Sequence, residues 1–282
     1  MFRISIFEFR IFYYLNASSV SPSRVGTSRE GKALSVRLIY MKKNKYLFLY
    51  AGSIFHKIDS WIFRVKPGYL NQIESLLRRK ETMLETGLTQ KHSDIFTLSL
   101  GTYNKCFLIK KIKFQIAADY LRRYIGRSQA FREFFASTTL LSIKVQCPTP
   151  ISYGVNLSPF GQYESLYICE YIENSINGVE FLIEEKGIKE RSSFLSAVAQ
   201  DLATIHNNGF FHKDSHFGNI LCKFVDPTKI FWIDNDLKKI KSLRNKYEKI
   251  ALGRFQKILR RDIISIKEWD FFIETYFSYL KK

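Results

Sequence analysis

Four polar residues in the C-terminal half of the chain have the types and the spacing that phosphoryl transfer requires. His212 precedes Asp214 by two positions, and Asn219 follows Asp214 by five. The apolar run Ile230–Ile233 then ends abruptly at Asp234. An aspartate can accept the proton of an attacking hydroxyl, and an asparagine and a second aspartate can hold the metal ions that bridge nucleotide phosphates. Because this chemistry asks the protein for positioning and charge neutralisation, the stretch predicts a phosphoryl-transfer site.

The same stretch resembles a known type of catalytic loop. The spacing His-x-Asp-x-x-x-x-Asn is similar to that of protein-kinase-like enzymes, and the fuller pattern adds His216 and Gly218. With Ile-Asp-x-Asp at 233–236 it resembles two groups more closely. One is the lipopolysaccharide kinases of the Kdo/WaaP family, which phosphorylate inner-core sugars; the other is the aminoglycoside and choline phosphotransferases. The bland alternative is a polar surface turn, which explains a lone Asp–Asn pair but not the whole set.

This resemblance implies a role for each residue of the site. Asp214 is expected to be the catalytic base, with His212 and Lys110 also catalytic. Asn219 and Asp234 are expected to hold Mg²⁺, and the phosphoryl donor is expected to be ATP.

Lys110 lies in a run of strand-forming residues, where a charged side chain is costly unless it is paired. The resemblance implies that such a lysine contacts the α- and β-phosphates and pairs with a helix glutamate. Strand alternation places Lys110 and Lys111 on opposite faces, so a shifted register would make Lys111 the functional residue. A third interpretation is that the strand simply ends in a solvated lysine run that includes Lys113. We favour Lys110.

The predicted helix 127–145 supplies the partner of this lysine. Its apolar residues recur at helical spacing, Ser128 can cap its first turn, and Glu133 is its only acid. The Arg-Glu pair, followed by Pro-Thr-Pro and Tyr-Gly, resembles the lipopolysaccharide kinases. After it, an apolar strand turns polar at the position of the interlobe hinge. The resemblance implies that Glu170 and Ile172 contribute to the ATP site there, where backbone groups bind adenine.

The remaining elements complete a kinase-like order. Strands are expected at 46–50, 61–65, 95–100 and 105–112, a short helix at 70–86, a hairpin turn at 101–104, and further helices at 190–208 and 269–276. This order predicts an α+β, two-lobed protein-kinase-like fold. A small, mainly β N-lobe with one key helix is joined to a reduced, mainly α C-lobe. We expect 1–40 to be a poorly ordered extension, 41–173 the N-lobe and 174–282 the C-lobe.

The composition is strongly basic. The 282 residues carry a formal net charge of +18, and a segment of ten basic residues opposed by one acid follows Asp234. It comprises Lys238, Lys239, Lys241, Arg244, Lys246, Lys249, Arg254, Lys257, Arg260 and Arg261. Such charge favours polyanionic partners, although a solvated helix face and a biased codon usage are the plainer explanations. The four scattered cysteines predict neither a zinc site nor a disulfide framework, and we interpret them as reduced residues of a cytoplasmic protein.

Several functions compete for this set of residues. The favoured one is an ATP- and Mg²⁺-dependent kinase of the lipopolysaccharide (lipid A-core) inner core. Such an enzyme is expected to be a cytoplasmic monomer in peripheral contact with the anionic inner membrane. A protein kinase fits less well, because Asp-Asn-Asp replaces Asp-Phe-Gly and little chain follows Asp234. A small-molecule phosphotransferase usually takes cationic substrates, which a basic protein disfavours. A pseudokinase conflicts with the intact Asp214, Asn219 and Asp234, and no nucleic-acid-binding motif is present.

Overall fold

Alternating apolar residues in the first half of the chain form β-strands, as their spacing predicts. The protein is represented by a computed structural model that describes residues 54–58, 60–66, 68–78, 88–89, 91–100, 105–114, 119, 128–158, 162–184, 187–240 and 244–281. The expected strand 46–50, the turn 101–104 and the expected N-terminal extension 1–40 lie outside these ranges. No helix in the described ranges is long and apolar enough to cross a membrane.

Seven strands among the described residues form one antiparallel sheet in the order β1-β2-β6-β7-β5-β4-β3. They are β1 (Ile54–Ile58), β2 (Trp61–Val65), β3 (Leu88–Thr89), β4 (Ser93–Leu100), β5 (Lys105–Lys113), β6 (Pro150–Asn156) and β7 (Tyr163–Glu170). The strands predicted at 61–65, 95–100 and 105–112 are therefore confirmed. β5 lies between β4 and β7, so it is an interior strand of the sheet rather than an edge strand.

The two faces of β5 contact different helices. Phe107 and Ile109 belong to a core cluster that includes Ile73 of α3 (Leu70–Arg78). Ile112 packs instead with Phe134 of α5 (Gln129–Ser142). Because strand residues alternate between faces, Lys110 shares its face with Ile112 and therefore with α5.

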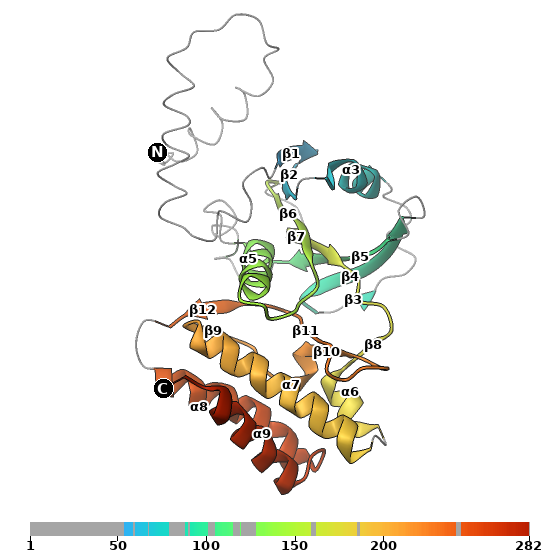
Figure 1. Ribbon diagram of the computed structural model, residues 1–282. Coiled ribbons are helices and arrows are strands. Elements are labelled where there is room, and N and C mark those ends of the chain that lie inside the picture. Colours follow the sequence, from blue (N-terminus) through green and yellow to red (C-terminus); the bar gives the residue numbers. More distant parts are fainter. Residues whose placement is uncertain are drawn as a thin grey trace, which may run out of the picture. The chain divides into compact units, whose positions relative to one another are not determined.

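The helix predicted at 127–145 is confirmed as α5, shown in Figure 1 between the sheet and the helical part of the protein. The Oγ of Ser128 accepts a hydrogen bond from the N–H of Phe131 at 3.2 Å, so Ser128 caps the helix as its sequence position predicts. The predicted helix 70–86 is present as α3, which covers the part of that range that the structure describes.

The chain after β7 is mainly helical. It contains β8 (Ser175–Asn177), α6 (Gly178–Ile183), α7 (Ile188–Asn207), β9 (Phe210–His212), η2 (Phe217–Asn219), β10 (Ile220–Lys223), β11 (Ile230–Trp232), β12 (Leu237–Lys239), α8 (Arg244–Phe255), η3 (Gln256–Arg261) and α9 (Ile266–Tyr279). The predicted helices 190–208 and 269–276 are confirmed as α7 and α9. β8 pairs with β10 of this part rather than with the large sheet, and we propose the lobe boundary between residues 173 and 174.

An aromatic cluster fixes the turn that carries the predicted catalytic loop. The ring of Phe217 in η2 lies 5.9 Å from Phe194 of α7, 4.8 Å from Phe255 of α8 and 5.7 Å from Phe272 of α9, measured between centroids. All four rings are buried. Aromatic pairs at these separations stabilise a fold beyond the area they bury. The loop therefore rests on the core of the helical part rather than on solvent.

None of the four cysteines, all of which lie in the described ranges, forms a disulfide, and Cys147, Cys169 and Cys222 are buried. His206 is also buried, and its Nδ1 lies 2.7 Å from the hydroxyl of Tyr276 on α9. Neither result points to a metal or disulfide site in this part of the chain.

Arg191 joins several elements of the helical part, and its loss is expected to be costly. Its guanidinium donates to Glu268 Oε1 at 2.6 Å, to Glu268 Oε2 at 3.2 Å and to the carbonyl of Ile263 at 2.9 Å, and it also contacts the carbonyl of Leu182. Hydrogen bonds to charged groups contribute about 1.5–3 kcal/mol each. We expect Arg191→Met to lower the free energy of unfolding in urea by about 2–3 kcal/mol.

The pH dependence of the stability loss in Arg191→Met tests whether the loss comes from the contact with Glu268. Burial raises the pKa of Glu268, but hydrogen bonds from Arg191 and Ser265 outweigh burial and bring that pKa below its ordinary value of 4.5. A depressed carboxyl pKa stabilises the fold above the pKa of the unfolded chain and loses that effect as the pH falls. The gap between parent and Arg191→Met should therefore narrow below about pH 4.5. A gap that is constant with pH, or an equal loss for Arg260→Met at an exposed position, would contradict this account.

Candidate active site

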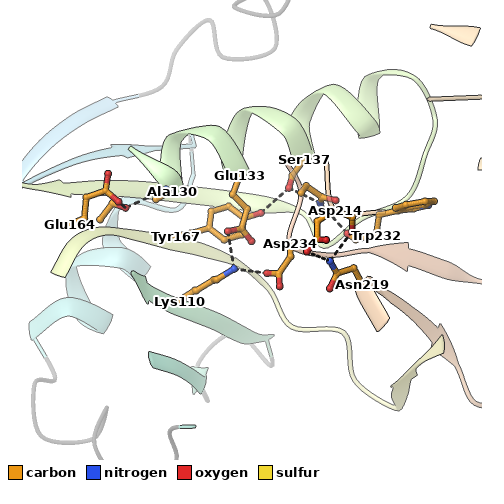
Figure 2. Close-up of polar contacts among 12 residues, drawn as sticks. Lys110, Ala130, Glu133, Ser137, Glu164, Tyr167, Asp214, Asn219, Trp232 and Asp234 are labelled. Carbon is orange, nitrogen blue, oxygen red and sulfur yellow. Dashed lines mark hydrogen bonds and ion pairs between the residues drawn. The ribbon is translucent and has the colours of Figure 1, made fainter. Parts of the chain in front are cut away.

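The two lobes meet at a buried lysine that lies between two carboxylates. Lys110 of β5 donates a hydrogen bond from Nζ to Glu133 Oε2 of α5 at 3.1 Å and also contacts Asp234 Oδ1. Figure 2 shows the three side chains pointing toward one another below α5. Lys110 and Glu133 are 8% and 7% exposed, whereas half of the Asp234 side chain faces solvent. The lysine of the sheet thus links the helix of the N-lobe to the loop after β11.

The strand register decides between the two lysines as the partner of Glu133. Lys111 projects from the opposite face of β5, where its Nζ lies 5.1 Å from the ring centroid of Phe96 and 5.6 Å from that of Tyr163. Lys111 is therefore held by aromatic faces on the far side of the sheet, and it is Lys110 that reaches α5.

Electrostatics keep this lysine charged. Burial lowers the pKa of Lys110, but the charges of Glu133 and Asp234 more than offset burial, and the net shift is upward. Burial also raises the pKa of Glu133 to about 7, against the opposing effect of Lys110. A cation that is held in place by carboxylates, with the exposed Asp234 on one side, is suited to bind an anionic group such as a phosphate.

Asp214 and Asn219, in the predicted catalytic loop, are in direct contact with each other. The amide Nδ2 of Asn219 donates to the carbonyl of Asp214 at 2.9 Å and to its Oδ2 at 3.1 Å. The Asp214 side chain is 62% exposed, and His216 Nε2 lies 3.6 Å from its Oδ2. The N–H of Ile233 donates to the carbonyl of Asn219 at 3.0 Å, which ties this loop to the residue before Asp234. The exposed carboxylate of Asp214 is therefore fixed and accessible.

The oxygen atoms of Asn219 and Asp234 form a donor set that fits Mg²⁺. Both groups that Asn219 Nδ2 contacts are acceptors, so its Oδ1 must face away from Asp214. Mg²⁺ prefers oxygen ligands and is usually bound by one or two carboxylates together with substrate phosphates. The described residues contain no cluster of three or more His, Cys, Asp or Glu side chains that could hold a metal ion.

Asp234 has an unusual backbone. Its φ is 53°, in the left-handed region that non-glycine residues seldom adopt, although aspartate tolerates it better than most. The strand β11 ends two residues earlier, and the N–H of Trp232 donates to the carbonyl of Gln146 at 2.9 Å. Strained conformations of this kind are concentrated at functional sites. Here the strain turns the carboxylate toward Lys110.

His212 lies in the core beneath the predicted catalytic loop. Its imidazole is fully buried, lies 5.2 Å from the ring of Trp232, and its Nε2 is 3.1 Å from Asn235 Oδ1. Burial lowers the pKa of His212 to about 4, so the ring is neutral near neutral pH. The catalytic role expected for His212 stays a prediction, and its contacts in the structure are with Trp232 and Asn235.

The predicted hinge residues lie between the two lobes. Glu170 ends β7, pairs with Phe107 of β5 and accepts a hydrogen bond from the hydroxyl of Tyr69 at 3.4 Å. The carbonyl of Ile172 accepts from Ser175 Oγ at 2.7 Å, and no described residue accepts from the Ile172 N–H. The segment therefore offers a backbone donor at the edge where the sheet meets the helical part.

Asp236 makes two contacts beside the site, one with Arg132 and one with Lys213, that could not be predicted from the sequence. Asp236 accepts from Arg132 Nη1 at 2.6 Å and from Lys213 Nζ at 2.8 and 2.9 Å, and β12 pairs with β9 next to the catalytic loop. The Asp-Asn-Asp triplet and the Arg-Glu pair were visible in the sequence, but nothing in it indicated that they meet.

Comparisons with known proteins agree with this geometry. A model described as the lipopolysaccharide kinase (Kdo/WaaP) family matches residues 87–276. A 3-deoxy-D-manno-octulosonic acid kinase from Vibrio parahaemolyticus is 29% identical over 186 residues, which cover 64% of this chain and 74% of that protein. A solved structure described as WaaP in complex with acyl carrier protein superposes with a TM-score of 0.57 at 15% identity, over 77% of this chain and 88% of that chain.

The structural likeness confirms the predicted α+β, two-lobed kinase-like fold. The relative is a kinase by name, and the family model spans all of the residues discussed above from Lys110 to Asp236. Among the functions considered from the sequence, these findings favour a lipopolysaccharide kinase over a protein kinase, a small-molecule phosphotransferase or a nucleic-acid-binding module. Since the family model covers well over half of the sequence, this chain belongs to the lipopolysaccharide kinase (Kdo/WaaP) family.

Proposed function

We propose that this protein transfers the γ-phosphoryl group of ATP to a hydroxyl of Kdo in the inner core of lipopolysaccharide. The observation that carries the proposal is the convergence of Lys110, Glu133 and Asp234 beside the fixed pair Asp214 and Asn219. The name of the Vibrio relative favours Kdo as the acceptor. A heptose acceptor is the second candidate, since the family as a whole includes kinases of inner-core sugars.

In this proposal Asp214 is the general base. Its carboxylate is more exposed than that of Asp234, so an acceptor hydroxyl can approach its oxygen, and Asn219 holds Asp214 through two hydrogen bonds. A base positioned in this way accelerates a reaction by about 10²–10⁴-fold. His212 acts as a positioning residue: it is neutral, it is buried beneath the loop, and its Nε2–H holds Asn235.

Lys110 is proposed to bind the phosphates of ATP, with Glu133 holding its ammonium group in place. Asp234 Oδ1 accepts a hydrogen bond from this ammonium group, and a phosphate oxygen is proposed to bind beside this contact. Ile172 is proposed to donate its N–H to the adenine, and Glu170 to form the neighbouring wall of the pocket. These residues bind and orient the nucleotide, and none of them takes part in bond breaking.

Mg²⁺ is proposed to be held by Asn219 Oδ1 and the Asp234 carboxylate. When bound, it would neutralise charge on the phosphates and orient them for in-line transfer. The role of the protein in this step is to aim two oxygen ligands at one place. Two observations support this role: Asn219 Nδ2 donates a hydrogen bond to the carbonyl of Asp214, which holds the amide, and Asp234 has a left-handed backbone.

The basic segment, residues 238–261, is proposed to bring the enzyme to its acceptor at the anionic cytoplasmic face of the inner membrane. The basic side chains of this segment differ in their contacts and exposure, and therefore in how readily they can reach a membrane. Lys238 Nζ donates to Tyr247 Oη at 2.8 Å, and the Arg254 guanidinium lies 5.6 Å from the ring of Phe211. Lys239, Lys246, Lys249 and Lys257 are exposed, as Lys238 is, whereas Arg254 is half-buried. We propose that these four lysines make the peripheral membrane contact of a cytoplasmic monomer that does not bind nucleic acid.

Replacing Lys239, Lys246, Lys249 and Lys257 with Gln should raise KM for the glycolipid acceptor and leave KM for ATP unchanged. Each basic residue near an anionic membrane contributes about 1 kcal/mol, and salt screens it over a Debye length of about 8 Å. The defect should therefore shrink as salt is raised. The matched control replaces four exposed lysines outside the basic segment with Gln: Lys57, Lys91, Lys189 and Lys267. This control should have the same KM for the acceptor as the parent. Equal binding of both variants to anionic vesicles at low salt would show that the segment is only solvated surface.

Lipid A-core from cells with and without the gene provides the test of the proposed function. Mass spectrometry should find that the molecule loses one phosphoryl group in the deletion strain and regains it on complementation. Fragmentation assigns the phosphate to a sugar. A phosphate on heptose would select the second candidate, and an unchanged core would reject the proposed function.

A further inference from the structure

Asp236 lies at the centre of an ionic network that joins α5 to the catalytic loop. Its Oδ2 accepts from Arg132 Nη1 at 2.6 Å, and both of its carboxylate oxygens accept from Lys213 Nζ, at 2.8 and 2.9 Å. The carbonyl of Asp236 also accepts from the N–H of Lys213 at 2.9 Å. Arg132 precedes Glu133 in α5, and Lys213 precedes Asp214 in the loop. One carboxylate thus holds the direct neighbours of two proposed active-site residues.

Asn235 makes a second connection to the same helix. Its Nδ2 donates to Ser137 Oγ of α5 and to the carbonyl of Trp232, each at 3.0 Å, and its Oδ1 faces His212 Nε2 at 3.1 Å. Because Nδ2 faces two acceptors, Oδ1 must accept, and His212 must carry its proton on Nε2. Tyr167 of β7 adds a hydrogen bond to Ser137 Oγ at 3.2 Å. The side chain of Asn235 is buried, so each of these bonds is shielded from water.

We propose that Asn235 and Asp236 are positioning residues that fasten α5 to the catalytic loop, so that Lys110, Glu133 and Asp234 stay assembled without phosphorylation. The inference rests on the proposed roles of these three residues in nucleotide binding. In protein kinases the corresponding lysine–glutamate pair forms only when the helix is correctly placed, which phosphorylation of a loop can control. Here the carboxylate of Asp236 lies opposite Arg132 and Lys213, and we assign to it the role that an added phosphate has in such kinases.

The number and kind of these bonds argue against a freely swinging helix. Arg132 and Ser137 lie on successive turns of α5, so the helix is held at two points along its length. Moving it away would break the charge-assisted contact with Asp236 and would leave the amide of Asn235 buried without its partner on α5. Buried polar groups that lose their partners are costly, and charge-assisted hydrogen bonds are the stronger ones.

The test combines kinetics with hydrogen exchange on the full chain. Asp236→Asn and Arg132→Gln should each lower kcat/KM for ATP by about 5- to 30-fold and speed amide exchange in α5. The double variant should be hardly worse than Asp236→Asn alone, because Asp236→Asn already removes the contact with Arg132. Asp236→Glu should recover part of the lost activity. Asp226→Asn, which removes a carboxylate from an exposed ion pair with Lys229, is the matched control and should change neither quantity.

Additive losses with unchanged exchange in α5 would overturn the proposal, and so would a loss of activity when the purified parent is treated with a phosphatase. If Asp236→Asn proves too unstable to assay, amide exchange in α5 of the Arg132→Gln variant tests the proposal by itself. The Arg132 side chain is 38% exposed and contributes little to the core, so this variant should fold. Failure of the proposed function looks different. In that case Lys110→Met would bind ATP as tightly as the parent, whatever the exchange of α5.

Discussion

Asp234→Asn should abolish phosphoryl transfer and leave the fold intact. The side chain is half exposed, so replacement by an isosteric amide should cost little stability. What is lost is the negative charge that faces Lys110 and that is proposed to bind Mg²⁺. Asparagine also tolerates the left-handed backbone at this position, so the φ of 53° gives no separate reason for a defect.

The control for this variant is Asp262→Asn. Asp262 is exposed and has a φ of 55°, so it offers the same chemical change on the same type of backbone, but it follows η3 outside the proposed site. We expect Asp262→Asn to retain parental kcat and both variants to unfold at nearly the parental urea concentration. Normal turnover in Asp234→Asn would contradict the assignment of this residue and, with it, the proposed metal site.

Asp214→Ala should lower kcat by about 10²–10⁴-fold, the range for a positioned general base. KM for ATP should change little, because Asp214 contacts neither Lys110 nor the hinge. The substitution removes the carboxylate but keeps the backbone carbonyl that accepts from Asn219 at 2.9 Å, so the loop retains one of its two hydrogen bonds. The effect should therefore come from the lost base rather than from a displaced Asn219.

Steady-state kinetics with ATP and acceptor varied separately measure this effect. A fall in kcat with an unchanged dissociation constant for ATP fits a residue that acts on the acceptor hydroxyl. Weak ATP binding with preserved kcat would instead assign Asp214 to the nucleotide, and the general base would have to be sought elsewhere.

The sequence was sufficient to predict the contact between the sheet and α5. The resemblance implied that the strand lysine pairs with a helix glutamate, and Glu133 is the only acid of its helix, so the pair could be named from the sequence. The choice between Lys110 and Lys111 could not be made in the same way. It depends on which face of β5 meets α5, and that is set by the pairing of β5 with β4 and β7.

The contacts of His212, Asn235 and Asp236 were beyond sequence reasoning for a related cause. Each depends on how the loop after β11 folds back between α5 and the catalytic loop, which no periodicity encodes. The pattern His-x-Asp placed His212 among the catalytic residues, because spacing along the chain does not reveal burial. The basic segment likewise includes Lys238 and Arg254, whose aromatic partners Tyr247 and Phe211 could not be assigned from composition.

Transfer by the purified protein tests the central claim most directly. The protein is incubated with ATP, Mg²⁺ and lipid A that carries Kdo as its only core sugar, and the product is examined by mass spectrometry with fragmentation. The account predicts that the acceptor gains one phosphoryl group on Kdo and that Asp214→Ala gives almost none in the same time. ATP consumed without a phosphorylated sugar, or a product that forms only after heptose is added to the acceptor, would contradict it.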